Sequence, residues 1–381
     1  MPISSRFAHC LIYSSLICAL SACGGGAYRD PTIDCLKKNP KASLDELKKC
    51  TTDTKTTPKP SPAATATPAP SPTSTGAPNN IRLSPPKQGL LSIGNNINLE
   101  YLDFGGKGEP VILLAGGGNT AYIYTRFAPM LSDQYRVIAL SRRGYGASSQ
   151  PSTGYDTATL SNDLHAAINA LGLNRVTLIG HSIAGDEMTR FAALHPERVS
   201  RLVYLDAAYD RTAMLPVLLE KMPAIAEPEP TATQVASISG LQNYRQQTRG
   251  VRWPEEEIRA LVKTTPQGEI TEQVTPEHIE VQLITGVIAP DYSKVKAPAL
   301  AIYAQPQKPS DVFPWLKPTD SQWLIAQTAI NQTLLPAYQQ QRDLFARTMA
   351  KQQTLVLPGA NHYVFISHQD EVLRAIRAFM Q

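Results

Sequence analysis

The chain has 381 residues, 42% of them hydrophobic, and a formal net charge of +4 at pH 7. This length allows more than one domain, and the modest charge, without a dense basic patch and interleaved aromatic residues, argues against a nucleic-acid partner. The cysteines all fall within the first fifty residues, which excludes thiolate nucleophiles and cysteine metal sites from the rest of the chain. They are Cys10, Cys18, Cys23, Cys35 and Cys50.

Residues 1–22 have the pattern of a secretory signal peptide. A short apolar run, Leu11 to Leu20, has about half the length that a membrane-spanning helix needs. It ends in Leu-Ser-Ala-Cys, which resembles the lipobox of bacterial lipoproteins, and this resemblance implies that Cys23 becomes the first residue and carries acyl chains. An ordinary signal peptide with an incidental cysteine is the alternative. Because three glycines follow like a flexible tether, we expect a lipid anchor on the periplasmic or surface face of a bacterial membrane.

Two further segments separate this leader from the folded part. In residues 23–50, Cys35 and Cys50 bracket a short stretch with helical spacing, and an oxidising compartment favours a disulfide between them over two free thiols. Residues 51–80 are rich in Pro, Thr and Ala and contain no Ile, Leu, Val, Phe, Met, Trp or Tyr. Such a segment cannot bury apolar surface to offset its ordering entropy, so we predict an extended or disordered spacer. The folded domain then covers residues 81–381.

Apolar runs of strand length alternate with helical patterns in this domain. Alternating apolar and polar residues predict a half-buried strand at 96–104. Continuous apolar runs predict strands buried on both faces at 109–115, 135–141 and 175–180, and three more apolar strands at 201–206, 299–304 and 353–358. Helical spacing follows at 160–171, capped by Asp156 or Thr157, and again at the end of the chain after Ser367. We therefore expect an α/β fold, a mostly parallel sheet with helices on both faces and a ligand site at the carboxyl ends of the strands.

The alternation breaks at two places. About ninety residues, from Ala207 to Lys296, separate two predicted strands, which is too long for a connecting loop. We interpret residues 210–295, approximately, as an inserted and mostly helical cap over the active edge of the sheet. Residues 305–351 form a second long insertion.

The sequence LIGHSIAG places Ser182 between a predicted buried strand and a predicted helix. Here the chain resembles the α/β-hydrolase family, roughly over residues 90–381. The family motif is small-x-Ser-x-small, and this chain has Gly180 and Ala184 at the small positions. Small neighbours permit a strained turn that exposes the hydroxyl beside the free N–H groups of the next helix. The resemblance implies that Ser182 is a nucleophile, whereas the alternative is a helix N-cap, a common role for Ser.

The resemblance also implies a histidine on the loop after the last strand. His362 lies there, and His368, at the start of the final helix, is its rival. An acidic residue must orient the imidazole and stabilise its charged form. Asp206, at a strand end, and Asp311, in the loop after the strand at 299–304, are both candidates, with Asp206 preferred.

Three glycines follow the strand at 109–115. The resemblance implies an oxyanion hole made by the backbone N–H of Gly117, with Gly118 as the alternative, and the N–H of Ile183. Glycine suits a backbone that must approach a substrate closely, although a flexible turn would show the same residues. The segment SRRGYGASSQP resembles the family's Asp-x-Arg-Gly-x-Gly-x-Ser turn, with Ser141 in the Asp place, and we interpret it as scaffold.

A Ser–His–acid set with two N–H donors performs acyl transfer, which requires no metal and no cofactor. Dehalogenases and epoxide hydrolases of the family use Asp as nucleophile, so we expect a small-molecule carboxylic ester as substrate. Amide or aminopeptidase-type cleavage is the alternative within enzymes; Glu255, Glu256 and Glu257 lie in the predicted cap, but consecutive residues of a helix point in different directions, which favours a solvated face. A non-catalytic binding protein on the same fold is the alternative outside enzymes.

Overall fold

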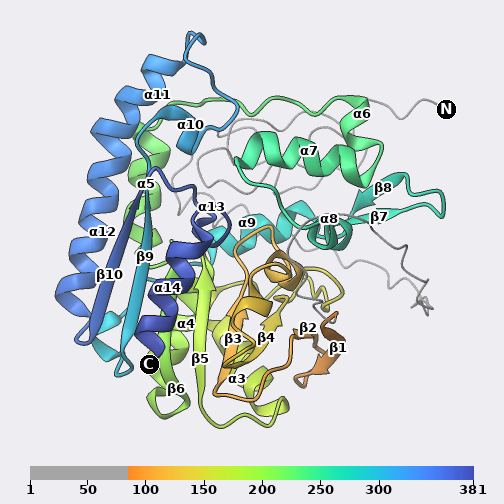
Figure 1. Cartoon of the computed structure of the whole chain (residues 1–381), viewed down its shortest axis with the longest axis vertical. Coiled ribbons are helices and arrows are strands. Elements are labelled where there is room, and N and C mark those ends of the chain that lie inside the picture. The colour runs from red at the N-terminus through yellow and green to blue at the C-terminus, as the bar shows by residue number, and fades with distance from the viewer. Residues whose placement is uncertain (1–84) are drawn as a thin grey trace.

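The computed structural model describes residues 85–381. The predicted signal peptide, Cys23, the Cys35–Cys50 pair and the spacer lie outside the described residues. The strands of the main sheet are β1 (Lys87–Ser92), β2 (Asn98–Asp103), β3 (Pro110–Leu114), β4 (Arg136–Leu140), β5 (Val176–His181), β6 (Val199–Leu205), β9 (Ala299–Gln305) and β10 (Gln352–Pro358). Their order in the sheet is β1-β2-β4-β3-β5-β6-β9-β10 (Figure 1). The strands from β4 to β10 pair in parallel, and only the two pairings that involve β2 are antiparallel.

Helical elements cover both faces of this sheet. One face packs against α3 (Thr157–Ala170), α4 (Ala184–Leu194) and α12 (Leu335–Thr348). The other face packs against two short 3₁₀ turns, η2 (Ala121–Tyr124) and η3 (Ala128–Met130), and against α14 (Gln369–Met380). A mostly parallel sheet between two helical layers is the predicted fold class, and the prediction is confirmed.

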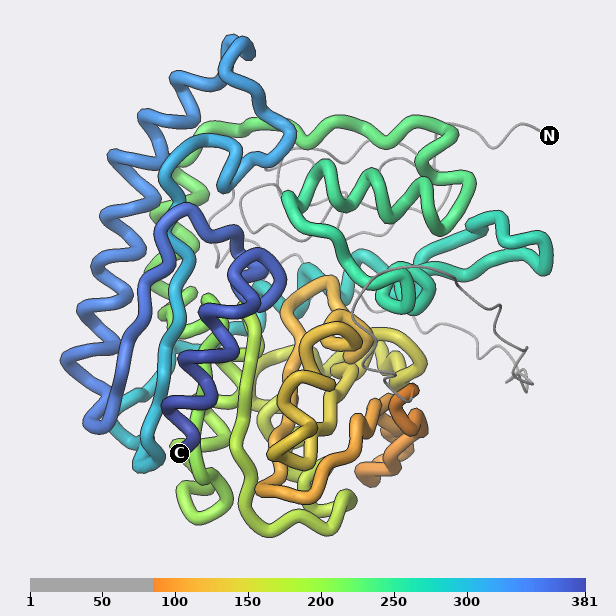
Figure 2. The backbone as a smooth tube through the Cα atoms, viewed as in Figure 1, coloured from red at the N-terminus to blue at the C-terminus, as the bar shows by residue number. Residues whose placement is uncertain are grey.

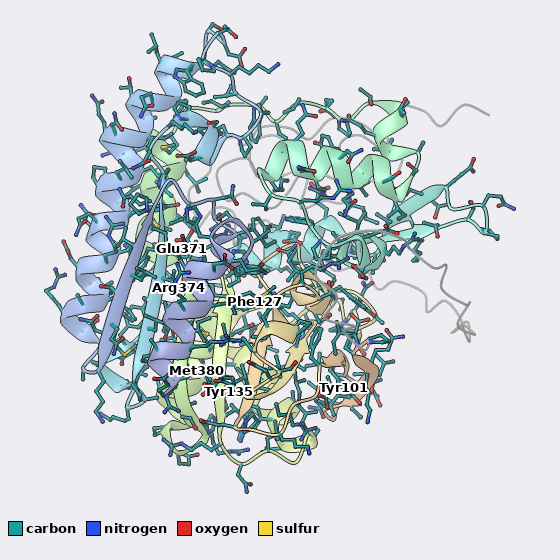
Figure 3. All side chains as sticks on the ribbon, viewed as in Figure 1. Tyr101, Phe127, Tyr135, Glu371, Arg374 and Met380 are labelled. Carbon is teal, nitrogen blue, oxygen red and sulfur yellow. The ribbon has the colours of Figure 1, made fainter. Side chains whose placement is uncertain are left out.

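The strand side chains divide between these two layers because successive residues of a strand point to opposite faces. In β3, Ile112 and Leu114 belong to the layer with α3 and α4, whereas Val111 and Leu113 belong to the layer with α14. Figure 3 labels Phe127, Tyr135 and Met380, three members of the second layer. Burial on both faces is the reason that these strands appear in the sequence as unbroken apolar runs.

The chain between β6 and β9 folds mainly into helices. They are α5 (Arg211–Lys221), α6 (Ala232–Val235), α7 (Ile238–Arg249), α8 (Glu255–Leu261), α9 (Glu277–Thr285) and the 3₁₀ turn η5 (Tyr292–Lys294). A two-stranded antiparallel hairpin, β7 (Val262–Thr264) and β8 (Ile270–Gln273), lies among them and was not predicted. Figure 1 shows α7, α8 and the hairpin together in the upper right of the view, beyond one end of the central strands.

The chain between β9 and β10 is also helical. It contains α10 (Pro309–Val312), α11 (Trp323–Ala329) and the π-helical turn η6 (Ile330–Leu334), which runs into α12. After β10 a short helix, α13 (Val364–Ser367), precedes α14, whose N-cap is His368. The final helix therefore begins two residues after the predicted start: Ser367 is the last residue of α13, and α14 begins at Gln369. Within residues 85–381 no helix has both the length and the hydrophobicity of a membrane span.

Candidate active site

Ser182 lies at the sharp turn between β5 and α4. Its φ angle is +55°, in the left-handed region that residues with a side chain seldom adopt. The turn is fixed by two backbone bonds: the Ser182 N–H donates to the Leu205 carbonyl at 3.2 Å, and the Gly185 N–H donates to the Ser182 carbonyl at 3.0 Å. The N-cap of α4 is Ile183, and no side chain caps this helix. The hydroxyl of Ser182 is therefore not used as a helix cap.

Small residues around Ser182 are required by close packing. A Cβ atom at Gly180 would lie 2.5 Å from the sulfur of Met188, and one at Gly185 would collide with the carbonyl oxygen of Ala207. These contacts let α4 start directly against the ends of β5 and β6. The glycine that follows Ala184, and not only the two small positions of the motif, is thus part of the turn.

His362 and Asp206 are brought together from the ends of two different strands. Nδ1 of His362 lies 2.6 Å from Oδ2 of Asp206. The other carboxylate oxygen of Asp206 accepts the backbone N–H of Ala304 at 3.0 Å and the hydroxyl of Tyr209. Asp206 also has a positive φ of 49° and is almost completely buried. The aspartate is therefore held in one orientation by donors on β9 and on the loop after β6.

Asp311, the other predicted acid, is engaged elsewhere. Its Oδ2 accepts the backbone N–H groups of Gln307 at 2.8 Å and Lys308 at 3.1 Å, at the exposed start of α10. The structure thus brings Asp206, and not Asp311, to His362. Sequence spacing alone could not decide between the two aspartates, because the position of the α10 loop depends on the insertion that follows it.

The loop that carries His362 turns back to the sheet directly after β10. Gly359, with a φ of +73°, makes the turn, and Figure 2 shows the dark blue chain after β10 heading towards the middle of the molecule. Nε2 of His181 lies 3.1 Å from the carbonyl oxygen of His362 and donates to it, since a carbonyl only accepts. Burial holds the pKa of His181 well below its usual range, so this ring is neutral and structural. His368 instead lies beside Ser367.

The glycine loop after β3 lies against the Ser182 turn. A Cβ atom at Gly116 would be 2.7 Å from Nδ1 of His181 and 3.1 Å from Cβ of Ser182, so only glycine fits there. A Cβ atom at Gly117 would be 3.8 Å from the side chain of Ile183. The two residues predicted to supply the oxyanion-hole N–H groups, Gly117 and Ile183, are therefore neighbours in space.

Arg142 holds the glycine loop by binding the backbone carbonyl groups of that loop. Its guanidinium donates to the carbonyl oxygens of Ala115 at 2.9 Å and Gly116 at 3.3 Å, and forms an ion pair with Glu187 at 2.8 Å. In a trans peptide the N–H points away from the carbonyl, so the Gly117 N–H points away from Arg142. The segment interpreted as scaffold thus contains the residue that orients the Gly117 peptide.

Glu257 of α8 holds the same loop from the other side. Its carboxyl group accepts Asn119 Nδ2 at 2.9 Å and the Thr120 N–H at 3.1 Å, and also contacts the Thr120 hydroxyl. Asn119 in turn accepts the hydroxyl of Tyr363, the residue after His362, at 3.1 Å. Burial raises the pKa of Glu257 to about 7, against the opposing effect of these hydrogen bonds.

The expectation that Glu255, Glu256 and Glu257 form a solvated face is wrong for the third. Glu255 and Glu256 are exposed, with arginine partners on the surface, whereas Glu257 has an exposed fraction of 0%. The sequence carries one signal for this difference, because Glu257 lies next to Ile258 on a short helix, but the partner loop is 137 residues away in the chain.

Helix α9 completes the surroundings of the Ser182 turn. Its Ile279 and Leu283 pack with Ile183 in a small apolar cluster. Its Glu280 points at the glycine loop, since a carboxyl oxygen lies 3.6 Å from the position of a Cβ on Gly117. Burial raises the pKa of Glu280 to about 7. Sequence analysis did not identify this carboxyl group.

A pocket lies between α5, the end of α7, α12 and the loops after β6, β9 and β10, with about 980 Å³ of empty space that includes open solvent at its mouth. Ser182, Asp206 and His362 all line it, and so does Asp311. Most of the remaining wall is apolar or aromatic and comes from both insertions. It includes Tyr209, Met214, Leu218, Val312, Phe313 and Tyr338. Within residues 85–381, no group of three or more His, Cys, Asp or Glu side chains could hold a metal ion.

Residues 109–369 match the family model described as alpha/beta hydrolase fold. A putative non-heme chloroperoxidase from Synechocystis sp. is 38% identical over 111 residues, which are 29% of this chain and 40% of that protein. A soluble epoxide hydrolase from Corynebacterium sp. is 35% identical over 112 residues, 29% of this chain and 39% of that protein. The chain thus spans about two fifths of the length of these curated relatives.

Solved structures are similar over a larger part of the chain. E-2-(acetamidomethylene)succinate hydrolase has a TM-score of 0.57 and 18% identity, covering 77% of this chain and 98% of that one. A bacterial membrane phospholipase A has a TM-score of 0.53 and 19% identity, covering 78% and 86%. At this identity the likeness concerns the fold alone. Because the family model covers more than half of the sequence, the chain belongs to the α/β-hydrolase family.

Proposed function

We propose that this protein is a serine hydrolase that cleaves carboxylic esters through an acyl-enzyme intermediate. The observation that carries the proposal is the 2.6 Å pairing of His362 with Asp206 at a pocket that Ser182 also lines. Ser182 stands on a strained turn, its hydroxyl is free of any helix-capping role, and the carboxylate that orients His362 is buried. This arrangement supports nucleophilic catalysis by a hydroxyl.

The proton of Ser182 passes to His362 in this mechanism. A carboxylate only accepts, so Nδ1 of His362 carries the proton shared with Asp206 and Nε2 is left as the base. Nε2 takes the hydroxyl proton while Oγ of Ser182 attacks the ester carbonyl, and Asp206 stabilises the imidazolium that forms. The protonated ring then delivers its proton to the leaving alcohol. Water, activated in the same way, releases the acid.

The negative charge that develops on the ester oxygen needs donors. The N–H groups of Gly117 and Ile183 are the donors we assign, because these residues are adjacent and the Gly117 peptide is turned away from Arg142. One such donor typically contributes about 10²–10³ in rate. No cofactor and no metal is required for this chemistry.

The serine also argues for an acyl substrate over an alkyl one. Relatives that match part of the chain include a soluble epoxide hydrolase and a fluoroacetate dehalogenase. A serine that attacked an epoxide or an alkyl halide would form an ether, which water activated by His362 would not cleave. An acyl-serine, by contrast, is an ester and is hydrolysed in the second half of the cycle.

A panel of p-nitrophenyl esters of rising acyl length, with an aminoacyl p-nitroanilide beside it, tests the proposal. We expect ester turnover by the wild type, at least about 10³-fold lower turnover by Ser182→Ala, and little cleavage of the anilide. Faster cleavage of the anilide would favour the amide or aminopeptidase alternative. A folded wild type that turns over neither substrate would favour the binding protein.

We also propose that the hydrolase is tethered to the cell envelope through a lipidated Cys23, on the support of the Leu-Ser-Ala-Cys sequence and the spacer of residues 51–80, which is rich in Pro, Thr and Ala. Expression with an alkyne-bearing fatty acid tests the tether. We expect the label on the wild type and its loss in Cys23→Ser. Equal labelling of both proteins, or labelling of neither, would contradict the anchor.

A further inference from the structure

The pocket lined by the candidate triad also has two arginines in its wall, and both are already paired. Arg211 forms an ion pair with Asp186 at 2.9 Å, and Arg249 forms one with Glu227 at 2.6 Å. The four side chains of these pairs are at most 3% exposed. Each charge is therefore matched inside the protein, and within residues 85–381 the wall offers a ligand no unpaired arginine or lysine.

The two carboxylates of the wall strengthen this restriction on charge. Asp206 is bound to His362, and Oδ2 of Asp311 accepts the backbone N–H groups of Gln307 and Lys308. Asp311 is partly exposed and still carries its negative charge towards the pocket that it lines. An anionic group of a ligand would meet this charge without a free cation to bind it, so the wall disfavours anions.

The uncharged polar side chains of the wall are also used within the protein, with one exception. Their hydrogen-bond acceptors are backbone carbonyl groups for Thr248 and Asn361, and other side chains for Tyr209 and Tyr363. The exception is Tyr338 of α12, whose hydroxyl forms no hydrogen bond with any of the described residues. The wall therefore presents few polar groups that a ligand could bind.

The rest of the wall is apolar and aromatic, and it comes from both insertions. Leu218 lies on α5, Val312 on α10, and Phe313 directly after α10. The rings of Tyr209 and Tyr338 stack, with their centres 5.2 Å apart and an angle of 28° between their planes. Figure 1 shows α5, α10 and α12 on the same side of the molecule, to the left of the view. Such a wall favours an aromatic ligand group, because ring pairs gain stability beyond the apolar area that they bury.

The position of the reacting groups indicates which part of an ester enters this pocket. Ser182, Asp206 and His362 line it, whereas Gly117 and Ile183, the donors assigned to the carbonyl oxygen, do not. His362 must deliver its proton to the oxygen of the leaving alcohol, so the alcohol lies on the His362 side of the reacting carbon. The pocket is therefore on the side from which the alcohol departs.

We propose that this pocket selects the substrate by its alcohol, and that the substrates are esters of uncharged aromatic alcohols. The proposal rests on the ester hydrolysis proposed above and gives that reaction a substrate class. The ring of the alcohol packs against Leu218, Phe313 and Tyr338, and no ion pair of the wall has to be broken to receive it.

Four esters test this assignment. Benzyl acetate and methyl phenylacetate are isomers that carry the same ring on the alcohol and on the acyl side, respectively. Methyl acetate lacks the ring, and 4-carboxybenzyl acetate adds a negative charge to it. We expect kcat/KM of the wild type to be highest for benzyl acetate, and to exceed that for methyl acetate by about 10- to 100-fold, the gain from burying an aromatic group. If any of the other three esters is cleaved as fast as benzyl acetate, the proposal is overturned.

Variants of the wall locate the preference for benzyl acetate over methyl acetate. Val312 is partly exposed, so Val312→Trp extends into the pocket without disturbing the core, and it should bring the two esters close to equality. Tyr338→Ala removes a ring of the wall and should lower the preference, whereas Tyr338→Phe keeps the ring and the preference. The ratio of two esters on one protein cancels any general loss of catalysis through Tyr209 and Asp206.

A matched control lies on the same insertion but outside the pocket. Leu324 of α11 is 75% exposed and does not line the pocket, so Leu324→Ala should keep the preference of the wild type. A preference that survives in both Val312→Trp and Tyr338→Ala, or that is lost in Leu324→Ala as well, overturns the assignment to this wall.

A binding measurement separates this proposal from ester hydrolysis. N-benzylacetamide, an amide of the same shape as benzyl acetate, is titrated calorimetrically into Ser182→Ala and into Ser182→Ala/Val312→Trp, with the melting temperatures showing that both are folded. We expect the double variant to bind at least about tenfold more weakly. Equal binding overturns the pocket assignment. Weaker binding by the double variant, together with a wild type that cleaves none of the four esters, overturns ester hydrolysis and not the binding of an aromatic group in this pocket.

Discussion

At the scale of single residues, the candidate site is marked by backbone strain. Four non-glycine residues among those described have a positive φ, and two of them are Ser182 and Asp206. Such conformations cost free energy and persist only where the surroundings fix them. At Asp206 the fixing groups are the N–H of Ala304 and the hydroxyl of Tyr209. These two groups bind one carboxylate oxygen, so the other faces His362.

Replacing Asp206 by Asn keeps this shape and changes one group. The amide nitrogen would face Nδ1 of His362 and favour the wrong tautomer, so we expect kcat on an ester to fall by about 10⁴-fold, with a normal melting temperature. Asp311→Asn, which only weakens a surface turn, should cost far less. Steady-state kinetics of the two variants measures both losses. A larger loss in Asp311→Asn would show that Asp311, and not Asp206, is the acid that acts on His362.

Some of these residues could be predicted from the sequence and others could not. Ser182 and His362 carry motif signals, because the turn needs small neighbours and the histidine follows the last strand. Asp206 could be named only beside Asp311, since the choice depends on the path of the loop after β9. Glu280 had no local signal and Glu257 only its place beside Ile258, because their partners lie more than a hundred residues away in the chain.

At the scale of elements, the glycine loop after β3 is held between the sheet and the cap helices. On one side Arg142 donates hydrogen bonds to the carbonyl groups of the loop, and on the other Glu257 of α8 accepts hydrogen bonds from Asn119 and Thr120. Tyr363 links the same loop to the loop of His362. The position of the Gly117 N–H therefore depends on α8, an element that contributes no reacting group.

Removing the carboxyl group of Glu257 should therefore impair turnover. Glu257→Leu leaves the Asn119 amide and the Thr120 N–H buried without an acceptor, each at about 1–3 kcal/mol, and lets the loop shift. We expect kcat to fall about 10²-fold, as when one oxyanion donor is lost, while Glu257→Gln retains most activity because its amide oxygen still accepts. Unchanged kcat in a folded Glu257→Leu protein would contradict this coupling.

The elements themselves were predicted unevenly. The central parallel strands from β4 to β9 in the sheet were predicted closely because burial on both faces produces unbroken apolar runs, whereas β10, at the edge, is mostly exposed. The edge strand β1 was missed, since it is largely exposed and contains Gly89. The β7–β8 hairpin was missed because it is short and polar, and because its stability depends on packing with its neighbours and not on a pattern of its own.

At the scale of the whole molecule, several carboxyl groups make stability depend on pH. Burial raises the pKa values of Asp186, Glu257 and Glu280 to about 7. In the unfolded chain these groups lose their protons near their ordinary values of 3.8 and 4.5. Between those values and pH 7 the folded state binds more protons than the unfolded state, so their joint effect is to lower stability as the pH rises.

Glu257→Gln isolates one of these groups. We expect the free energy of unfolding of the wild type, relative to Glu257→Gln, to fall by up to about 3 kcal/mol as the pH rises from 4.5 to 8. Denaturant unfolding of both proteins at several pH values measures this difference and cancels the contribution of the neutral His181. A difference that does not vary with pH, or that rises, would mean that Glu257 is ionised in the folded state throughout this range.

The account as a whole depends on Ser182 as the nucleophile. Treatment of the wild type with a fluorophosphonate, followed by mass spectrometry of its peptides, tests this role without knowledge of the natural substrate. We predict one adduct, on the peptide that contains Ser182, and none in Ser182→Ala. A folded wild type that remains unmodified, or an adduct on another residue, would contradict the account.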